Sequence, residues 1–173
     1  MKKILFALLA VTVCFAAVAC DSTPATQPVG TDTQFENSTE TETKEPVQRD
    51  IVALKDQMLQ KFNVTDSVEF NSDLLLNMYG IKAEDVEAVS GYMTLDGVFP
   101  QEVIMIKATG EQGKEAVISA LNKRIAEVKV QSENYDAKNY ALAQKCKVES
   151  DGLYVTMFLS PNVEEMTNMF YAN

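Results

Sequence analysis

The feature that most constrains the fold is the stretch QKCKVES-DG-LYVTMFLS, residues 144–160. Asp151-Gly152 separates two runs of strand-like composition, and this dipeptide favours the tight type I′ turn of a β-hairpin. A two-residue loop at this place pairs Ser150 with Leu153, Val148 with Val155, and Cys146 with Met157. Because these pairs share one face, the sequence predicts an antiparallel hairpin that turns Cys146 toward the core.

Further elements follow from apolar periodicity and capping residues. A helix from residue 51 carries its apolar residues at helical spacing after Asp50, a good N-cap. SDLLLNMYG predicts a short helix that Ser72 or Asp73 caps and Gly80 ends. VEAVSGYM and EVIMIKA favour strands, and residues 111–133 a long helix. A short helical piece at 137–142 precedes the hairpin, and NVEEMTNMFYA predicts a closing helix after Ser160-Pro161.

This element order, α-α-β-β-α-β-β-α, predicts an α+β domain. We expect two layers, with a four-stranded antiparallel sheet and helices on one face. The run Val103-Ile104-Met105-Ile106 is apolar on both faces, which favours a central place for its strand. With the two doubly apolar strands in the centre, the expected strand order is 1-2-4-3.

The N-terminus has the pattern of an export signal. MKK precedes the uncharged run ILFALLAVTVCFAAV, which is shorter than a bilayer span and ends in small residues. We therefore expect a signal peptide at residues 1–19. The exit Ala17-Val18-Ala19-Cys20 resembles the bacterial lipobox, which implies a diacylglycerol on the Cys20 thiol. The alternative is a secreted protein cleaved after Ala19, with a free Cys20 thiol.

Residues 20–49 have the composition of a linker. Ser, Thr, Pro and acidic residues dominate this segment, and apolar periodicity is missing. Such a segment buries too little apolar surface to offset its conformational entropy, so we expect a disordered acidic tether after the lipidated Cys20. The globular α+β domain should then span residues 50–173.

The charge of the chain limits its partners. The formal net charge is −10, and removal of Lys2 and Lys3 with the signal makes the mature chain more negative. Nucleic acid and anionic lipid should not attract such a chain. Contact with the membrane is expected through the lipid on Cys20, which supplies more than one acyl chain and so a stable anchor.

Several chemistries lack their usual residues. The chain has no histidine, which excludes Ser-His-Asp catalysis and histidine-containing zinc sites. No calcium-loop pattern is present, so we expect neither a metal nor a cofactor. Cys146 is the one candidate thiol nucleophile of the domain, and burial should make it inert. ATGEQGKEA at 108–116 departs from a phosphate loop, because Ala108 replaces a glycine and Glu115 a hydroxyl residue.

The stretch NMYGIKAEDVEAVSGYM, residues 77–93, is the remaining candidate site. Glu84, Asp85 and Glu87 are close in sequence, whereas paired catalytic acids must flank an open cleft at a defined separation. The acids fit better at the start of a single solvated helical turn. Tyr79 and Tyr92 are the candidate binding surface, and we predict no catalytic residues.

The chain resembles a known bacterial family over residues 50–172. The motifs LLLNMYGI, SGYM, EVIMIKA, SENY and LYVTMFLS, together with the lipoprotein signal and acidic tether, are similar to the lipoproteins of Gram-positive bacteria that carry domain of unknown function 4358. Ala83 and Ala137 stand where typical members have proline. The resemblance implies a fold and a location, and it provides no catalytic residues.

These observations lead to two hypotheses of function. In the first, the chain is a non-enzymatic binding or accessory lipoprotein on the extracytoplasmic face of the cell membrane, with a protein partner or small ligand. In the alternative, it is an enzyme that acts on the cell wall or its glycans through carboxylates. Its candidate acids would be Glu84, Asp85, Glu87, Asp96 and Glu102.

Overall fold

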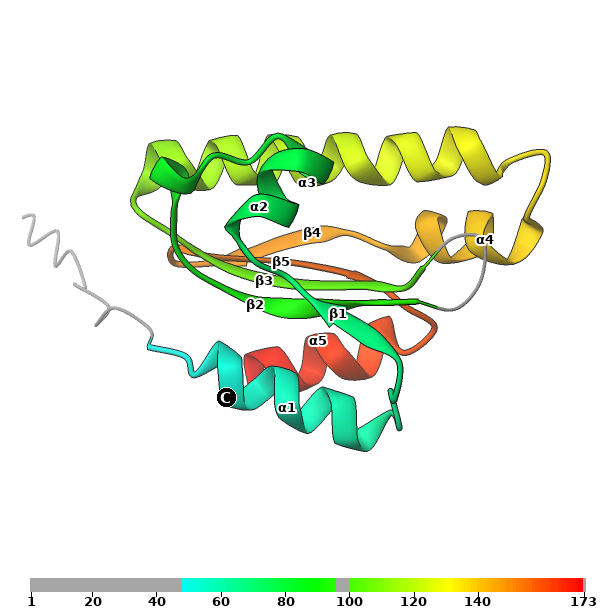
Figure 1. Ribbon diagram of the computed structural model, residues 1–173, viewed down its shortest axis with the longest axis horizontal. Coiled ribbons are helices and arrows are strands. Elements are labelled where there is room, and N and C mark those ends of the chain that lie inside the picture. The colour runs from blue at the N-terminus through cyan, green and yellow to red at the C-terminus, as the bar shows by residue number, and fades with distance from the viewer. Residues whose placement is uncertain (1–47, 96–99, 173) are drawn as a thin grey trace, which may run out of the picture. The chain divides into compact units, whose positions relative to one another are not determined.

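The computed structural model describes residues 48–95 and 100–172, all within one compact unit, residues 43–173. The predicted signal peptide, Cys20, most of the predicted tether and Asp96 lie outside these residues. The described part is an α+β structure with one antiparallel sheet (Figure 1). None of its helices is both long enough and apolar enough to cross a membrane.

The sheet has five strands, in the order β1-β2-β3-β5-β4. Their bounds are β1 Ser67–Glu69, β2 Val86–Thr94, β3 Glu102–Ala108, β4 Val148–Asp151 and β5 Tyr154–Leu159. The expectation of four strands in the order 1-2-4-3 was therefore wrong for the whole sheet, because β1 adds an edge strand beside β2. The four expected strands are present, and β3 and β5 lie next to each other inside the sheet, as their doubly apolar sequences indicate.

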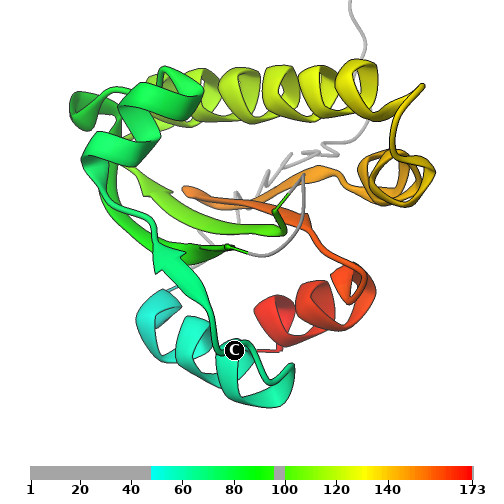
Figure 2. The same cartoon turned by 45° about the vertical axis from the view of Figure 1, so that its right-hand side comes forward.

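Helices cover both faces of the sheet, so the expected two-layer arrangement was wrong (Figures 1 and 2). On one face, Ile104 and Ile106 of β3 pack in a core with α3, which spans Glu111–Ser132. On the other face, Val103 and Met105 pack with α1, Ile51–Lys61, and α5, Val163–Tyr171. A strand that is apolar on both sides needs cover on both sides.

Local signals explain where the first helices begin and end. Asp50 caps α1 as predicted, its carboxylate accepting a hydrogen bond from the N–H of Ala53 at 2.9 Å. The next helix begins as α2, Ser72–Leu74, and continues as a π-helical turn, η1, Leu75–Tyr79. Its cap is Asn71, not Ser72 or Asp73. Gly80 ends this helix with φ of 70°, a left-handed conformation that suits glycine.

The hairpin forms with a different register from the predicted one. Its loop is Gly152-Leu153, so Val148 pairs with Met157 and Ser150 with Val155. The shift of two residues keeps each side chain on its expected face. Cys146 lies before β4, at the end of α4, Ala137–Lys145, but it is buried in the core beside α3 as expected.

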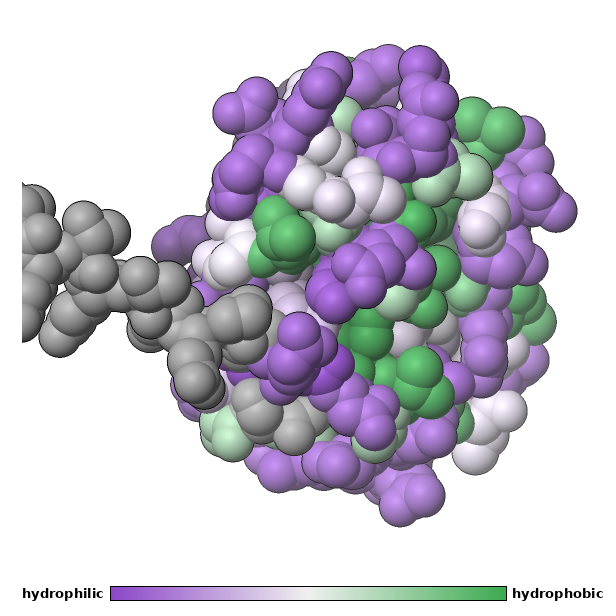
Figure 3. Space-filling model, turned by 90° about the vertical axis from the view of Figure 1, so that its left-hand side faces the viewer, coloured by the Kyte–Doolittle hydropathy of each residue, from purple (hydrophilic) through white to green (hydrophobic). Residues whose placement is uncertain are grey.

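Exposed apolar side chains are spread over several elements of the described surface. In the view of Figure 3, hydrophobic residues form spots among many hydrophilic ones. The large apolar residues that are exposed are Val52, Val68, Leu76, Leu95, Val130, Tyr135 and Tyr171. They come from α1, β1, η1, α3, α5 and connecting segments, so concave features are the better guide to a site.

Candidate functional site

Tyr79, a predicted binding-surface residue, belongs mainly to the core and is 8% exposed, although it also lines a small pocket of about 240 Å³ with Gly80 and Arg124. It closes η1 over the α3 face of the sheet, where its ring packs edge-on against Phe70 with centroids 5.8 Å apart. Its hydroxyl donates a hydrogen bond to the Glu102 carboxylate at 2.6 Å. Burial, followed by the charge of Glu102, raises the pKa of Tyr79 well above its usual value. Tyr79 therefore holds a buried acid in place.

Glu102 forms a buried ion pair with Arg124. Glu102 begins β3 and is 0% exposed, while Arg124 reaches it from α3. The Arg124 Nε lies 3.1 Å and 3.2 Å from the two carboxylate oxygens, and Nη2 bonds the first of them. This hydrogen bonding raises the pKa of Arg124 above its usual value. Glu102, Arg124 and Tyr79 thus form one buried polar cluster, which we call the Glu102 cluster.

Arg124 is not among the residues predicted from the sequence, although a signal was present. The chain has only two arginines among its 15 cationic residues, Arg49 and Arg124. Arginine presents a rigid fork of donors and suits buried pairs better than lysine does. Arg49 pairs with Asp151, and its guanidinium lies 4.4 Å from the centre of the Phe170 ring. Both arginines therefore join distant segments.

Tyr92 is also part of the core, on the opposite face of the sheet. It is 0% exposed and packs among residues of α1 and α5, so it does not form the expected binding surface with Tyr79. Its hydroxyl has no hydrogen-bond partner among the described residues. Burial raises the pKa of Tyr92 to about 12.

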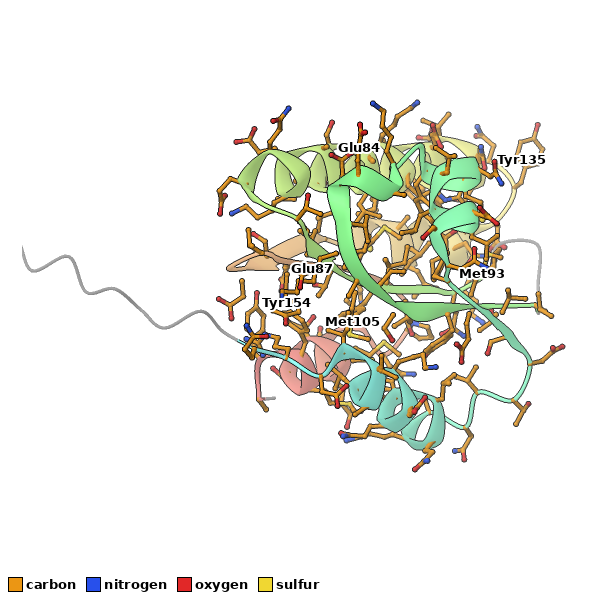
Figure 4. All side chains as sticks on the ribbon, turned by 60° about the vertical axis from the view of Figure 1, so that its left-hand side comes forward. Glu84, Glu87, Met93, Met105, Tyr135 and Tyr154 are labelled. Atoms are coloured by element: carbon orange, nitrogen blue, oxygen red, sulfur yellow. The ribbon has the colours of Figure 1, made fainter. Side chains whose placement is uncertain are left out.

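The acidic turn is solvated, as predicted. Ala83–Asp85 form a single 3₁₀ turn, η2. The side chains of Glu84 and Glu87 are 73% and 52% exposed and pair with Lys82 and Lys107, respectively. Figure 4 shows the two acids at separate places, Glu84 beside α3 and Glu87 along β2.

The loop before α3 does not have the surroundings of a phosphate site. A shallow pocket of about 320 Å³ lies there, and its lining includes Glu84 and Asp85. These carboxylates would repel a phosphate. Gly113 lies so close to η2 that an added Cβ would be 2.8 Å from the Asp85 carbonyl oxygen. The glycine therefore serves the packing of α3 on η2.

Cys146 has the environment expected of an inert thiol. It is buried in the core beside α3, and this burial raises the pKa of Cys146 to about 12. A thiol with so high a pKa provides almost no thiolate near neutral pH. In residues 48–95 and 100–172, no group of three or more acidic or cysteine side chains is placed to hold a metal ion.

A groove with converging polar groups lies between α5 and the edge strand β4. It has a volume of about 440 Å³. Its lining comes from the end of α4, both hairpin strands and α5: Lys145, Lys147, Glu149, Thr156, Phe158, Val163, Glu164, Thr167 and Asn168. The groove exists because Met166 and Phe170 direct α5 toward β5 and α1, leaving this side of β4 open.

Polar side chains in this groove are available to a ligand. Thr156 lies in the floor and is only 2% exposed, yet its hydroxyl has no hydrogen-bond partner within the described part of the chain. Lys145 and Lys147 have no ion-pair partner among those residues either. The Thr156 hydroxyl is not fully enclosed, so water or a polar group of a ligand can reach it from the groove. We call this site the α5–β4 groove.

The comparisons with known proteins identify the family of the chain. No curated protein and no solved structure matches it. A family model, described as domain of unknown function (DUF4358), matches residues 60–160, which include all of the sheet and α3. This range covers more than half of the chain, and the chain belongs to the DUF4358 family.

Proposed function

We propose that the chain is a membrane-anchored extracytoplasmic lipoprotein whose domain is a non-enzymatic binding or accessory module. In this proposal, residues 1–19 direct export and Cys20 carries the lipid. The acidic segment up to residue 49 is the tether, and the domain binds its ligand in the α5–β4 groove. The tether and anchor would hold the binding site near the membrane surface.

The observation that carries the binding role is the set of unpartnered polar groups in the α5–β4 groove. Ligand sites combine an apolar lining with a few polar groups that fix orientation. Here Phe158 and Val163 supply apolar surface, while Thr156, Thr167 and Asn168 supply hydroxyl and amide groups. The volume of about 440 Å³ lies within the usual range for small ligands.

The carboxylate enzyme gains no comparable support. Among the described acids of that hypothesis, Glu84 and Glu87 are exposed and paired with lysines, and Glu102 is enclosed by Arg124 and Tyr79. Such an enzyme requires two carboxyl groups that face one cleft. We therefore advance only the binding role.

The anchor is tested by the thiol chemistry of Cys20. Cells that express the chain are grown with an alkyne-tagged fatty acid, and the label is compared with that of Cys20→Ser. We expect the wild-type chain to carry the label and to sediment with membranes, and the variant to lose both properties. Cys146→Ser is the matched control. Equal labelling of the wild type and Cys20→Ser would contradict the anchor.

The binding role is tested by blocking the groove. A photo-reactive amino acid at position 168, within the groove, is compared with one at position 123, on the exposed side of α3. After irradiation of intact cells, mass spectrometry should find an adduct at position 168 that is absent from position 123. Thr167→Trp, which fills the groove, should abolish this adduct. The absence of an adduct at 168 would argue against the groove as the site.

A further inference from the structure

We infer that the α5–β4 groove binds a short peptide or an amino acid that has free ends and an apolar side chain. This inference rests on the proposed binding function and specifies its ligand. It follows from three properties of the groove: lining charges of both signs, the hydroxyl of the nearly buried Thr156, and an apolar wall.

The lining of the groove carries two cations and two anions. Lys145 and Lys147 come from the end of α4 and the connection to β4, and Glu149 and Glu164 come from β4 and α5. A ligand of one charge would meet repulsion from one of these pairs, whereas a zwitterion can satisfy both. Amino acids and short peptides with free ends are the common zwitterions of this size.

One charge of each sign is available to such a ligand. The lysines have no ion-pair partner within residues 48–95 and 100–172. Glu149 interacts with the Tyr171 hydroxyl, which leaves Glu164 as the carboxylate more open to an ammonium group. A ligand carboxylate therefore suits the lysines, and its ammonium suits Glu164.

The floor of the groove distinguishes a built site from a surface depression. Thr156 lies in the middle of β5, with Met105 and Glu149 as its cross-strand neighbours, and it is almost fully buried. Thr156 and Phe158, which alternate on the same face of β5, both line the groove. A peptide amide or carboxylate would supply the missing hydrogen bond, and an aliphatic side chain would cover the ring. The groove volume admits a ligand of one to a few residues.

The test uses four forms of one dipeptide and the full chain in detergent micelles. Isothermal titration calorimetry compares leucyl-leucine with its N-acetyl form, its C-terminal amide, and the form with both ends blocked. We expect the free dipeptide to bind most tightly. Each block should weaken binding by about three- to fivefold, because each removes one exposed ionic contact.

Variants of the groove connect each end of the dipeptide to its partner. In Lys145→Gln/Lys147→Gln, amidation of the C-terminus should no longer matter, and in Glu164→Gln, acetylation of the N-terminus should no longer matter. Thr156→Val keeps the branched shape and should weaken all four forms by about fivefold without loss of stability. Lys123→Gln removes a lysine outside the groove and should leave the affinities unchanged.

Each contrary result has a distinct meaning. Equal affinity for the free and doubly blocked dipeptides would overturn the zwitterion and leave the proposed binding function standing. If none of the four dipeptides bound while the adduct at position 168 still formed, the groove would bind another class of ligand, and this inference would be wrong. If both experiments failed, the proposed function would fail with it.

Discussion

Two buried tyrosines on opposite faces of the sheet differ in how their hydroxyl groups are satisfied. On the α3 face, the Glu102 cluster pairs a buried acid with Arg124 and with the Tyr79 hydroxyl. On the α1–α5 face, Tyr92 buries a hydroxyl that has no partner in the described chain. Both tyrosines are core residues, yet one is part of a polar network and the other fills space. The difference predicts unequal responses to the loss of a polar group.

The largest effect is expected from Arg124→Met. This change removes the cation from the Glu102 cluster and leaves a carboxylate in the core, which should destabilise the fold by about 3–5 kcal/mol. Urea unfolding followed by circular dichroism measures this loss. The double variant Arg124→Met/Glu102→Met removes both charges and should recover most of it. If the single and double variants were equally stable, the pair would have no role in the fold.

Loss of the Tyr79 hydroxyl should have the next largest effect. Tyr79→Phe keeps the ring contact with Phe70 and removes the hydrogen bond to Glu102. Hydrogen bonds to charged groups contribute about 1.5–3 kcal/mol, so we expect a loss in this range. The loss should disappear when Tyr79→Phe is made in the Glu102→Met/Arg124→Met background. If Tyr79→Phe lost as much stability in that background as in the wild type, the loss would come from changed packing and not from the hydrogen bond to Glu102.

These two predictions concern residues that local patterns could not assign. Helical spacing indicates that Tyr79 belongs to a helix and that α3 has an apolar stripe. It does not indicate that Arg124 crosses to the first residue of β3, 22 positions earlier in the chain. The scarcity of arginine was an available signal, because both arginines form pairs with distant acids.

Prediction of the fold from the sequence has the same limit: local residues indicate the elements, but they do not indicate contacts between distant segments. Apolar periodicity identified the main helices and four strands, because each depends on nearby residues. It did not identify β1, whose three residues, Ser67–Glu69, include no run of apolar side chains. The doubly apolar run at 103–106 indicated a central strand, and it should also have indicated helices on both faces. Assignment of each helix to a face depends on packing between distant segments.

Local sequence patterns do not predict the candidate groove either, because residues from separate segments of the chain form it. Lys145 and Lys147 precede the hairpin, and Thr167 and Asn168 lie in α5, the helix that follows it. Only the shifted hairpin register and the course of α5 bring them together. Threonine is common in strands, so the sequence does not single out Thr156. That its hydroxyl lacks a partner among the described residues becomes visible only in the three-dimensional structure.

The buried Cys146 thiol, on the α3 face, should make the stability of the fold depend on alkaline pH. Burial raises the pKa of Cys146 to about 12, whereas the pKa of an unfolded cysteine is about 8.5. The folded state therefore binds the proton more strongly. Stability is full below pH 8.5 and falls as pH rises, because the unfolded thiol ionises first. At pH 10 the expected loss is about 2 kcal/mol.

Cys146→Ala isolates this contribution from the other alkaline groups. Urea unfolding at pH 7, 8, 9 and 10 should give a shallower decline of stability for the variant than for the wild type. The slopes of the unfolding free energy against pH are compared, because truncation of a buried thiol lowers stability at every pH. Parallel declines would show that the Cys146 thiol is solvated, and rapid reaction of the folded chain with a thiol reagent would agree with that result.

Tyr92→Phe should have the smallest effect, and it is the sharpest test of the contrast between the two tyrosines. The hydroxyl is buried without a partner, so its removal eliminates an unfavourable burial and keeps the ring. We expect stability to change by less than about 0.5 kcal/mol, or to increase. The same urea experiment as for Tyr79→Phe measures it. A loss as large as that of Tyr79→Phe would mean that the Tyr92 hydroxyl bonds a buried water. Both tyrosine hydroxyls would then be satisfied, and the difference between them would be the identity of the partner and not its presence.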